Sequence, residues 1–359
     1  MPQGRTTIGG WLPCFAMMQW TLVFALALEV AAAGRNAAAR DVGIFCELID
    51  RQIPDRISYP KSPVYNESIS SYYSGQGRDI QPGCIFRPKD ETEVSAFLKL
   101  VTANIGGCSS LPKFAVRSGG HMIWPGSANI EDGITIDLRA MNGTVLNEDK
   151  TVLSLGPGGI WSEVYPQLEP YNLTVMGGRV PGIGVGGLAT GGGIHFSARQ
   201  NGWVCDNIYT YQVVLANGTI IEATASSRRD LWLALKGGSN NFGIVTRIDV
   251  PTWPLDMMWG GQVVFEFNQA NMDAHAREFS AFMSEENFDA AAHMGTTLVF
   301  DQGNWVIGDA LYYTKPVENP AVYEGLRSIE PKIIEMLRVQ KPSDLVDDST
   351  GLLPPNTTR

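Results

Sequence analysis

The spacing of apolar residues changes from helical to alternating several times along the chain, and each change predicts an element. Residues 41–53 (DVGIFCELIDRQI) have the spacing of an amphipathic helix. A turn-rich entry segment follows, and CIFRP at 84–88 predicts a short strand. Residues 89–106 predict a helix with acidic residues near its N-terminus, and KFAVRSGGH at 113–121 predicts a strand that enters a glycine turn. Together these elements predict a compact α/β unit.

From Gly133 onward the pattern is dominated by strands. The predicted strands are GITIDL, TVLSLGPG, LTVMGG and FGIVTRIDV, with YTYQVVLANGTIIEAT as a hairpin and with helices at IWSEVYPQLEPYN and RRDLWLALKG. Two prolines in VPTWPLD (Val250–Asp256) predict a domain boundary. Beyond it, several strands, the helix NMDAHAREFSAFM and a final helix predict a second, incomplete α+β domain at 253–345 with an antiparallel sheet. A polar tail at 346–359 completes the chain.

The N-terminus carries a mostly apolar stretch from Trp11 to Ala33 that ends in small residues. This pattern predicts a secretory signal peptide at 1–33, cut near Ala33, so that the protein is secreted. A retained membrane anchor is the alternative, but Gln19 and Glu29 interrupt the apolar run and leave it short of a membrane span. We therefore expect no stable membrane association. Translation could also begin at Met17 or Met18.

The composition excludes some partners and limits the covalent chemistry. The 359 residues are enough for two domains, and a net charge of −10 without a basic face argues against nucleic acid as a partner. After Cys14 in the signal peptide, four cysteines remain in the mature chain, without the CxxC spacing of a metal site. Two disulfides are therefore the most that can form, and no metal is expected. Glycosylation sequons begin at Asn66, Asn142, Asn172, Asn217 and Asn356.

Two glycine-rich segments carry most of the candidate chemistry. In VRSGGH (Val116–His121), consecutive glycines can turn backbone N–H groups toward one anion such as a diphosphate, although a tight turn with an incidental histidine has the same pattern. The segment GGRVPGIGVGGLATGGG (Gly177–Gly193) has nine glycines in seventeen residues, interrupted by apolar residues, and predicts a loop ordered around a ligand. It lacks the following helix and acidic residue of a Rossmann fingerprint and the lysine of a P-loop. We therefore predict a dinucleotide-binding site that is neither a Rossmann fingerprint nor a P-loop.

Five blocks occur together and in order between Arg78 and Val250 as they do in a known family. They are FAVRSGGH, GITIDL, the long segment from GPGGIWSEVY to GLATGGG, VCDNIYTYQVVLANG and LWLALKGGSNNFGIVT. The chain thereby resembles the FAD-linked oxidases of the vanillyl-alcohol oxidase/PCMH superfamily, within the fungal berberine-bridge-enzyme-like branch. The resemblance implies an α+β fold. Residues 34–77 would form an N-terminal helix and entry segment, and residues 78–252 a PCMH-type FAD-binding domain of two α/β subdomains.

The resemblance also implies which residues hold the FAD. The histidine of the RSGGH motif bonds covalently to the flavin in this family, so His121 would be the attachment residue. No cysteine stands in the later glycine loop, so single attachment is predicted. The remaining cofactor-binding residues would be Val116, Arg117, Ser118, Gly119, Gly120, Gly182, Gly184, Gly187, Gly191, Gly193, His195, Gly243, Ile244 and Val245. The alternative for His195 is that it lies beside the loop and makes its hydrogen bonds within the protein, without contacting the cofactor.

Two further expectations follow from the resemblance. Cys46 and Cys108 would form the disulfide that tethers the N-terminal helix in secreted members, while Cys84 and Cys205 would be buried thiols. Relatives usually continue for about a hundred residues beyond this chain, through a segment that covers the flavin and can supply a base. Nothing after Tyr313 matches that segment, which indicates a truncated sequence or a shortened protein.

The predicted function is that of a secreted FAD-dependent oxidase in secondary metabolism. It would take hydride from a small organic substrate and pass the electrons to dioxygen. The catalytic base is unassigned, with Tyr312 and Tyr313 as candidates by position only. The alternatives are a flavin-binding protein without catalysis, a carbohydrate oxidase of the same superfamily, and a secreted glycan-binding module that stacks sugars on Trp124, Trp161 or Trp203.

Overall fold

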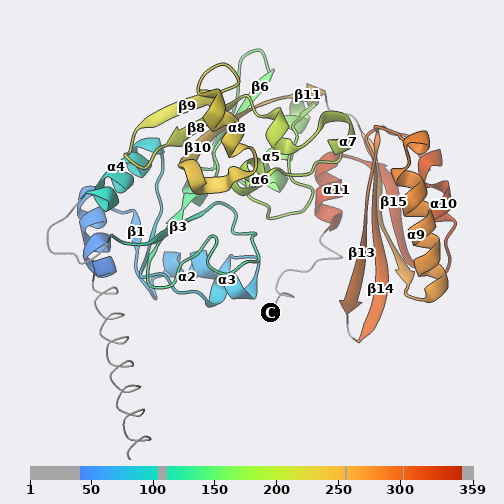
Figure 1. Ribbon diagram of the computed structural model, residues 1–359, viewed down its shortest axis with the longest axis horizontal. Coiled ribbons are helices and arrows are strands. Elements are labelled where there is room, and N and C mark those ends of the chain that lie inside the picture. Colours follow the sequence, from blue (N-terminus) through green and yellow to red (C-terminus); the bar gives the residue numbers. More distant parts are fainter. Residues whose placement is uncertain (1–40, 104–110, 255–256, 302, 350–359) are drawn as a thin grey trace, which may run out of the picture.

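The strands of the protein divide between a larger and a smaller lobe (Figure 1). The structure is a computed structural model that describes residues 41–103, 111–254, 257–301 and 303–349. The predicted signal peptide at 1–33, Cys108 and Asn356 lie outside the described residues. No helix in the described ranges combines the length and the apolar character needed to cross a membrane.

The first sheet of the larger lobe forms the predicted α/β unit. Its strands, in spatial order, are β1 (Ile57–Ser58), β2 (Cys84–Phe86), β4 (Ile134–Asp137) and β3 (Phe114–Arg117). Both β2 and β3 run parallel to β4, and helix α4 (Glu91–Thr102) connects them. The Asp90 side chain starts α4 by accepting hydrogen bonds from the amides of Thr92 and Glu93. The strand, helix and strand predicted for this region are confirmed.

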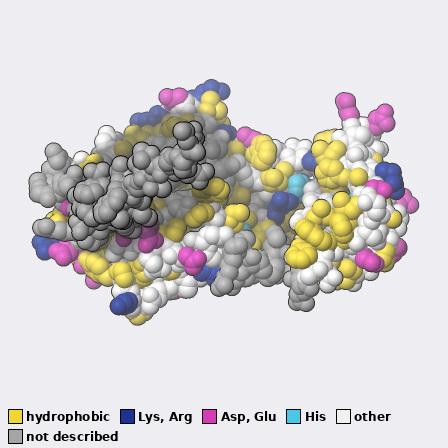
Figure 2. All heavy atoms as spheres, turned by 60° about the horizontal axis from the view of Figure 1, so that its bottom comes forward, with side chains coloured by type: hydrophobic (Ala, Val, Ile, Leu, Met, Phe, Trp, Pro, Cys, Tyr) yellow, Lys and Arg dark blue, Asp and Glu magenta, His cyan; other side chains and the backbone are white. Residues whose placement is uncertain are grey.

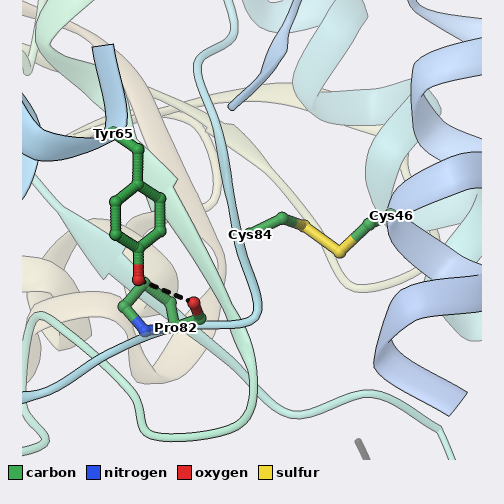
Figure 3. Close-up of a disulfide and its surroundings, with 4 residues drawn as sticks. All are labelled: Cys46, Tyr65, Pro82 and Cys84. Atoms are coloured by element: carbon green, nitrogen blue, oxygen red, sulfur yellow. Dashed lines mark hydrogen bonds between the residues drawn. A yellow bond between two sulfur atoms is a disulfide. The ribbon is translucent and has the colours of Figure 1, made fainter. Parts of the chain in front are cut away.

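A disulfide joins the N-terminal helix, residues 41–52, to β2, and it is not the predicted one. Cys46 bonds to Cys84 with their Cα atoms 6.3 Å apart (Figure 3). The predicted Cys46–Cys108 pair is therefore wrong, and Cys84 is not a free thiol. The physical reason is packing: the helix lies on the first sheet, and Cys46 and Cys84 share one buried apolar cluster. Cys205 is buried and free, as predicted.

The strand that carries Cys84 is held on its other side as well. The phenol of Tyr65, on α2 (Pro63–Ser70), donates a hydrogen bond of 2.8 Å to the Pro82 carbonyl just before β2 (Figure 3). Both contacts are buried, so the start of β2 is fixed between the N-terminal helix and α2.

The second sheet of the larger lobe is antiparallel. Its spatial order is β5 (Thr144–Leu146), β6 (Val152–Leu155), β10 (Ile244–Pro251), β8 (Thr210–Val214) and β9 (Ile220–Thr224). The predicted hairpin is β8–β9, and Gly218 closes its turn with φ +79°. Ser95 of α4 donates a buried hydrogen bond to the Gly218 carbonyl, which connects the second sheet to the first unit.

The smaller lobe is an antiparallel sheet in the order β13 (Ala292–Asp301), β14 (Asn304–Tyr313), β12 (Met258–Glu266) and β15 (Lys332–Gln340). Helices α9 (Gln269–Met283) and α10 (Glu324–Arg327) cover its face away from the larger lobe (Figure 1). The predicted α+β class with an antiparallel sheet is confirmed. Where the pattern predicts one final helix, the chain forms α10, then β15, then α11 (Pro342–Asp348).

Helix α11 returns from the smaller lobe to the larger one (Figure 1). It packs against α5 (Trp161–Leu168), and its Leu345 and Val346 are buried in the core of the larger lobe. Lys341, just before α11, pairs with Glu169 at 3.2 Å. The predicted polar tail at 346–359 thus begins inside a packed helix, because Leu345 and Val346 of α11 pack into the apolar core of the larger lobe.

Non-reducing peptide mapping will yield a cross-linked fragment that contains Cys46 and Cys84. Cys84→Ser will lower the free energy of unfolding by roughly 4 kcal/mol in the chain-entropy model, because the bond closes a loop of 38 residues. Urea unfolding measures this change. Cys205→Ala is the control and costs about 1 kcal/mol, since that thiol only packs. A fragment that joins Cys46 to Cys108 would contradict the structure.

Candidate functional site

A cavity of about 620 Å³ lies in the larger lobe between its two sheets. Its wall comes from the turn after β3, from helix α6 (Val185–Gly191) and from the segment after α8 (Arg229–Gly238). The lining residues are Val116, Ser118, Gly119, Gly120, His121, Met122, Ile123, Ser127, Ala128, Leu138, Pro157, Ile183, Gly184, Gly186, Gly187, Leu188, Thr190, Gly191, Gly237, Ser239, Asn240 and Val245. The volume and the mostly apolar wall suit a small organic ligand or cofactor.

The two glycine-rich segments of the sequence touch one another at this cavity. A Cβ atom on Gly119 would lie 2.6 Å from the Gly184 nitrogen, and one on Gly184 would collide with the Gly119 nitrogen. Ser118 locks the contact, because its hydroxyl donates to the Pro157 carbonyl at 2.5 Å and accepts from the Gly186 amide at 3.2 Å. Gly120, with φ +73°, then turns the chain toward His121. Only residues without side chains permit this approach.

His121 presents its ring to the cavity. The ring stacks on Tyr73 with centroids 4.0 Å apart and an interplanar angle of 14°. Its Nε2 atom is buried and has no hydrogen-bond partner in the described part of the chain. Burial lowers the pKa of His121, so the ring is neutral near pH 7. A neutral imidazole has one nitrogen with a free lone pair, so a ring in this position could act as a nucleophile toward an electrophilic ligand.

Helix α6 contributes three glycines to the cavity wall, Gly186, Gly187 and Gly191. A Cβ atom on Gly187 or Gly191 would meet nothing within 4 Å, so both glycines face open space. The neighbouring Leu188 and Ile183 add apolar surface. A flat, largely apolar ring system could lie directly against this backbone, whereas a larger residue at either glycine would occupy the same volume.

Arg117 does not line the cavity, although it was expected to. Residues alternate between the two faces of a strand, so Val116 faces the cavity and Arg117 faces away from it. The Arg117 guanidinium is fully buried, lies 3.8 Å over the Tyr72 ring and donates to Ser68 and Ser71. Its ion-pair partner is Asp137 at 4.0 Å.

The same carboxylate holds a second arginine. Burial by itself would raise the pKa of Asp137, but hydrogen bonding to Arg139 and the charges of Arg117 and Arg139 keep the pKa below its ordinary value. Arg139 Nη2 lies 2.8 Å from the Asp137 carboxylate. This buried network braces α2 against the strands that lead to the cavity.

The other expected cofactor residues divide between the cavity and its surroundings. Nine of the expected residues line the cavity wall: Val116, Ser118, Gly119, Gly120, His121, Gly184, Gly187, Gly191 and Val245. The residues that do not line it are Arg117, Gly182, Gly193, His195, Gly243 and Ile244. Gly182 is close to it, since a Cβ there would lie 3.9 Å from the His121 ring. Gly243 and Ile244 instead pack on β8 and in the core.

His195 lies beside a separate hollow of about 180 Å³ with Met176, Ser197 and Trp253. Its Nδ1 atom is 2.8 Å from the Ser197 hydroxyl. Burial, and then the neighbouring Arg179 and His293, lower the pKa of His195 to about 3. The expected contact between His195 and the cofactor cavity is absent from the described residues.

Sequence reasoning missed the segment after α8. Gly237 breaks the helix with φ +103°, and Gly237, Ser239 and Asn240 line the cavity. A Gly-Gly-Ser-Asn-Asn run directly after an amphipathic helix is the pattern that could have indicated it.

Neither candidate base lines the cavity. Tyr312 of β14 is buried against Phe196, and burial raises the pKa of its hydroxyl. Tyr313 donates to Asp289 at 3.0 Å.

Comparison with known proteins identifies the cavity domain. Residues 82–224 match the model of an FAD binding domain. The FAD-dependent monooxygenase tpcD of Cochliobolus heterostrophus is 33% identical over 348 residues, which cover 91% of this chain and 65% of that protein. The FAD-dependent monooxygenase drtC of Aspergillus calidoustus is 38% identical over 268 residues, which cover 74% of this chain and 50% of that protein. The chain thus spans between half and two thirds of these relatives.

Solved structures share the fold at low identity. 6-Hydroxy-D-nicotine oxidase from Arthrobacter nicotinovorans has a TM-score of 0.72 at 22% identity, covering 82% of this chain and 63% of that one. Carbohydrate oxidase from Microdochium nivale has a TM-score of 0.71 at 21% identity, covering 87% and 67%. Most of the residues that line the cavity fall within residues 82–224, so the cavity belongs largely to an FAD binding domain. The chain is similar in sequence to fungal FAD-dependent monooxygenases and shares its fold with oxidases of the vanillyl-alcohol oxidase/PCMH superfamily, as its sequence motifs predict.

Proposed function

We propose that the protein is an FAD-dependent oxidase that carries its flavin on His121 and takes hydride from a small organic substrate. One observation carries the proposal: the ring of His121, whose Nε2 atom has no hydrogen-bond partner among the described residues, lines a glycine-walled cavity of about 620 Å³. FAD has a diphosphate that suits closely approaching backbone and a flat ring that suits a wall without side chains. The residues present therefore fit the cofactor that the family binds.

Different parts of the wall have different tasks in this proposal. The turn Ser118–Gly120, held against Gly184, brings backbone close to the diphosphate. Gly187 and Gly191 leave room for the ring, and neutral His121 supplies the nitrogen for the covalent bond. The bound flavin would supply a two-electron acceptor. A single attachment is proposed because the segment 177–193 has no cysteine and Cys205 is buried among core residues.

The electron acceptor is proposed to be dioxygen, which is reduced to hydrogen peroxide. The structural neighbours are oxidases, whereas the curated relatives are called monooxygenases. A monooxygenase is therefore the second candidate, and a carbohydrate oxidase or a flavin protein without catalysis are further alternatives. Trp161 is fully buried and cannot stack on a sugar, which removes one of the three tryptophans of the glycan-binding alternative.

We also propose that the protein is secreted and acts in fungal secondary metabolism. The Cys46–Cys84 bond suits an oxidising compartment. The four described sequon asparagines, Asn66, Asn142, Asn172 and Asn217, are exposed and accessible for glycosylation. The matched relatives from Cochliobolus and Aspergillus are fungal, which supports the metabolic assignment.

His121→Ala will release the flavin. Acid precipitation of the purified wild-type protein will leave the yellow colour in the pellet, and the same treatment of the variant will leave it in the supernatant, because the bond to the imidazole is missing. His195→Asn is the matched control and will retain its colour, since His195 lies outside the cavity lining. Wild-type colour that moves entirely to the supernatant would exclude covalent attachment.

Gly187→Leu will abolish flavin incorporation without unfolding the domain. The new side chain would project into open cavity space, and leucine favours a helix over glycine by about 0.5–1 kcal/mol. Flavin absorbance per protein and the unfolding midpoint are the two measurements. Gly143→Leu is the control, because that exposed glycine also has nothing within 4 Å but lies away from the cavity lining. Normal flavin content in Gly187→Leu would contradict the placement.

Dioxygen will reoxidise the holoprotein after anaerobic photoreduction, with equimolar hydrogen peroxide. The readouts are the return of flavin absorbance and a peroxide assay, with a sample held under argon as the control. Protein that stays reduced in air would identify a dehydrogenase and overturn the choice of acceptor.

A further inference from the structure

Basic side chains from the two lobes meet at their junction. Arg179, in the glycine-rich segment of the larger lobe, lies 2.6 Å from His293 on β13 of the smaller lobe, measured between Nη1 and Nε2. His195 lies close enough to Arg179 and His293 for both residues to lower its pKa. We refer to Arg179, His195 and His293 as the interlobe cluster. Figure 2 shows Lys or Arg and His side chains together in the hollow between the lobes.

The hydrogen bonds fix where the protons are in this cluster. An arginine side chain only donates, so His293 must accept at Nε2 and is neutral. Burial, followed by the charges of Arg179 and Arg199, lowers the pKa of His293 to about 4, in agreement with the neutral ring. The positive charge of the cluster therefore resides on Arg179.

His195 contributes a donor without an acceptor. The Ser197 backbone amide donates to its Nδ1 at 3.2 Å, so the proton of the neutral ring is on Nε2. The side chain is only 6% exposed, and Nε2 has no partner among the described residues. A buried N–H that is left unpaired is costly unless a ligand supplies an acceptor.

Unlike several other buried or partly buried arginines, Arg179 has no carboxylate partner among the described residues. Arg117, Arg56 and Arg247 each have a carboxylate partner at 4.0 Å or less. Arg179 makes no ion pair with any described residue. Burial lowers the pKa of its guanidinium, and the neighbouring hydroxyls of Tyr312 and Tyr165 only partly oppose that change. Among the described residues, the Arg179 side chain makes one hydrogen bond, to His293, although its guanidinium has five N–H donors. A cation that is largely removed from water and has no counterion is stabilised when an anion binds to it.

The cluster is connected to the flavin cavity through one short loop. Arg179 precedes Gly182, which lies beside the His121 ring, and Ile183 and Gly184, which line the cavity. Arg179 is therefore only a few residues away in the sequence from the residues that line the cavity.

We infer that the interlobe cluster binds an anionic oxygen group of the substrate, a carboxylate or a phenolate, with Arg179 supplying the charge and His195 an additional donor. This inference rests on the proposed function and narrows its substrate class to organic acids or acidic phenols. Neutral sugars, the substrates of a carbohydrate oxidase, have no group that matches the charge.

Binding of small probes to the purified holoprotein tests the inference without turnover. Calorimetry compares benzoate with neutral benzamide, and 4-nitrophenolate with neutral 4-nitroaniline. The wild type will bind at least one anion at least about tenfold more tightly than its neutral counterpart, because a charged hydrogen bond is lost in the neutral pair. The pair with the larger preference identifies carboxylate or phenolate as the natural group.

Three variants localise the effect. Arg179→Gln will remove the preference for the anion, and Arg179→Lys, which keeps the charge without the planar fork, will restore part of it. Arg229→Gln is the control, since it removes one charge from an exposed residue without an ion pair in the described chain and will leave the preference unchanged. The unfolding midpoint of each variant shows that the lobes remain folded.

The outcomes separate this inference from the proposed function. Equal affinities for both members of each pair in the wild type, or an undiminished preference in Arg179→Gln, would overturn the inference even if the flavin is bound and active. Anion binding that depends on Arg179 in a protein that carries no covalent flavin would support the cluster and contradict the proposed function.

Discussion

The close approach of two glycine turns is the constraint on which the site depends. Gly119 and Gly184 come from segments more than sixty residues apart, and each occupies the space in which the other would carry a side chain. Ser118 holds the pair by hydrogen bonds to Pro157 and Gly186. Because this contact orients the turn that ends in His121 and the start of α6, the two main walls of the cavity are positioned by a single backbone contact.

The remainder of the larger lobe supports that contact from outside. Arg117 and Asp137 form a fully buried pair behind the wall, so the strand that leads into the turn is fixed at its charged end. The Cys46–Cys84 bond and the Tyr65 hydrogen bond hold the neighbouring strand β2. The smaller lobe contacts the larger one through His293 and α11, and His293 lies against Arg179, a partly buried arginine that makes no ion pair with any described residue.

Local sequence patterns were sufficient to predict the helices and strands, but not to predict which cysteines pair or which residues line the cavity. The strand before RSGGH, the helix of α4 and the β8–β9 hairpin were predicted from periodicity, capping and turn residues. Periodicity cannot distinguish a buried thiol from a half-cystine, and so Cys84 was misassigned. Motif position likewise suggested that the Arg117 backbone and His195 contact the cofactor, although neither residue lines the cavity. Strand alternation turns the Arg117 side chain away, and the fold places His195 beside another hollow. Gly237 was missed because its role depends on the long-range contact of α8 with the cavity.

The most direct test of the account is an experimental structure of the purified protein, with the electron density of the cavity as the measurement. We expect density continuous with the His121 ring, a flat ring system against Gly187 and Gly191, and a diphosphate beside Ser118–Gly120. A cavity that contains only ordered water, in protein that is nevertheless folded as described, would contradict it.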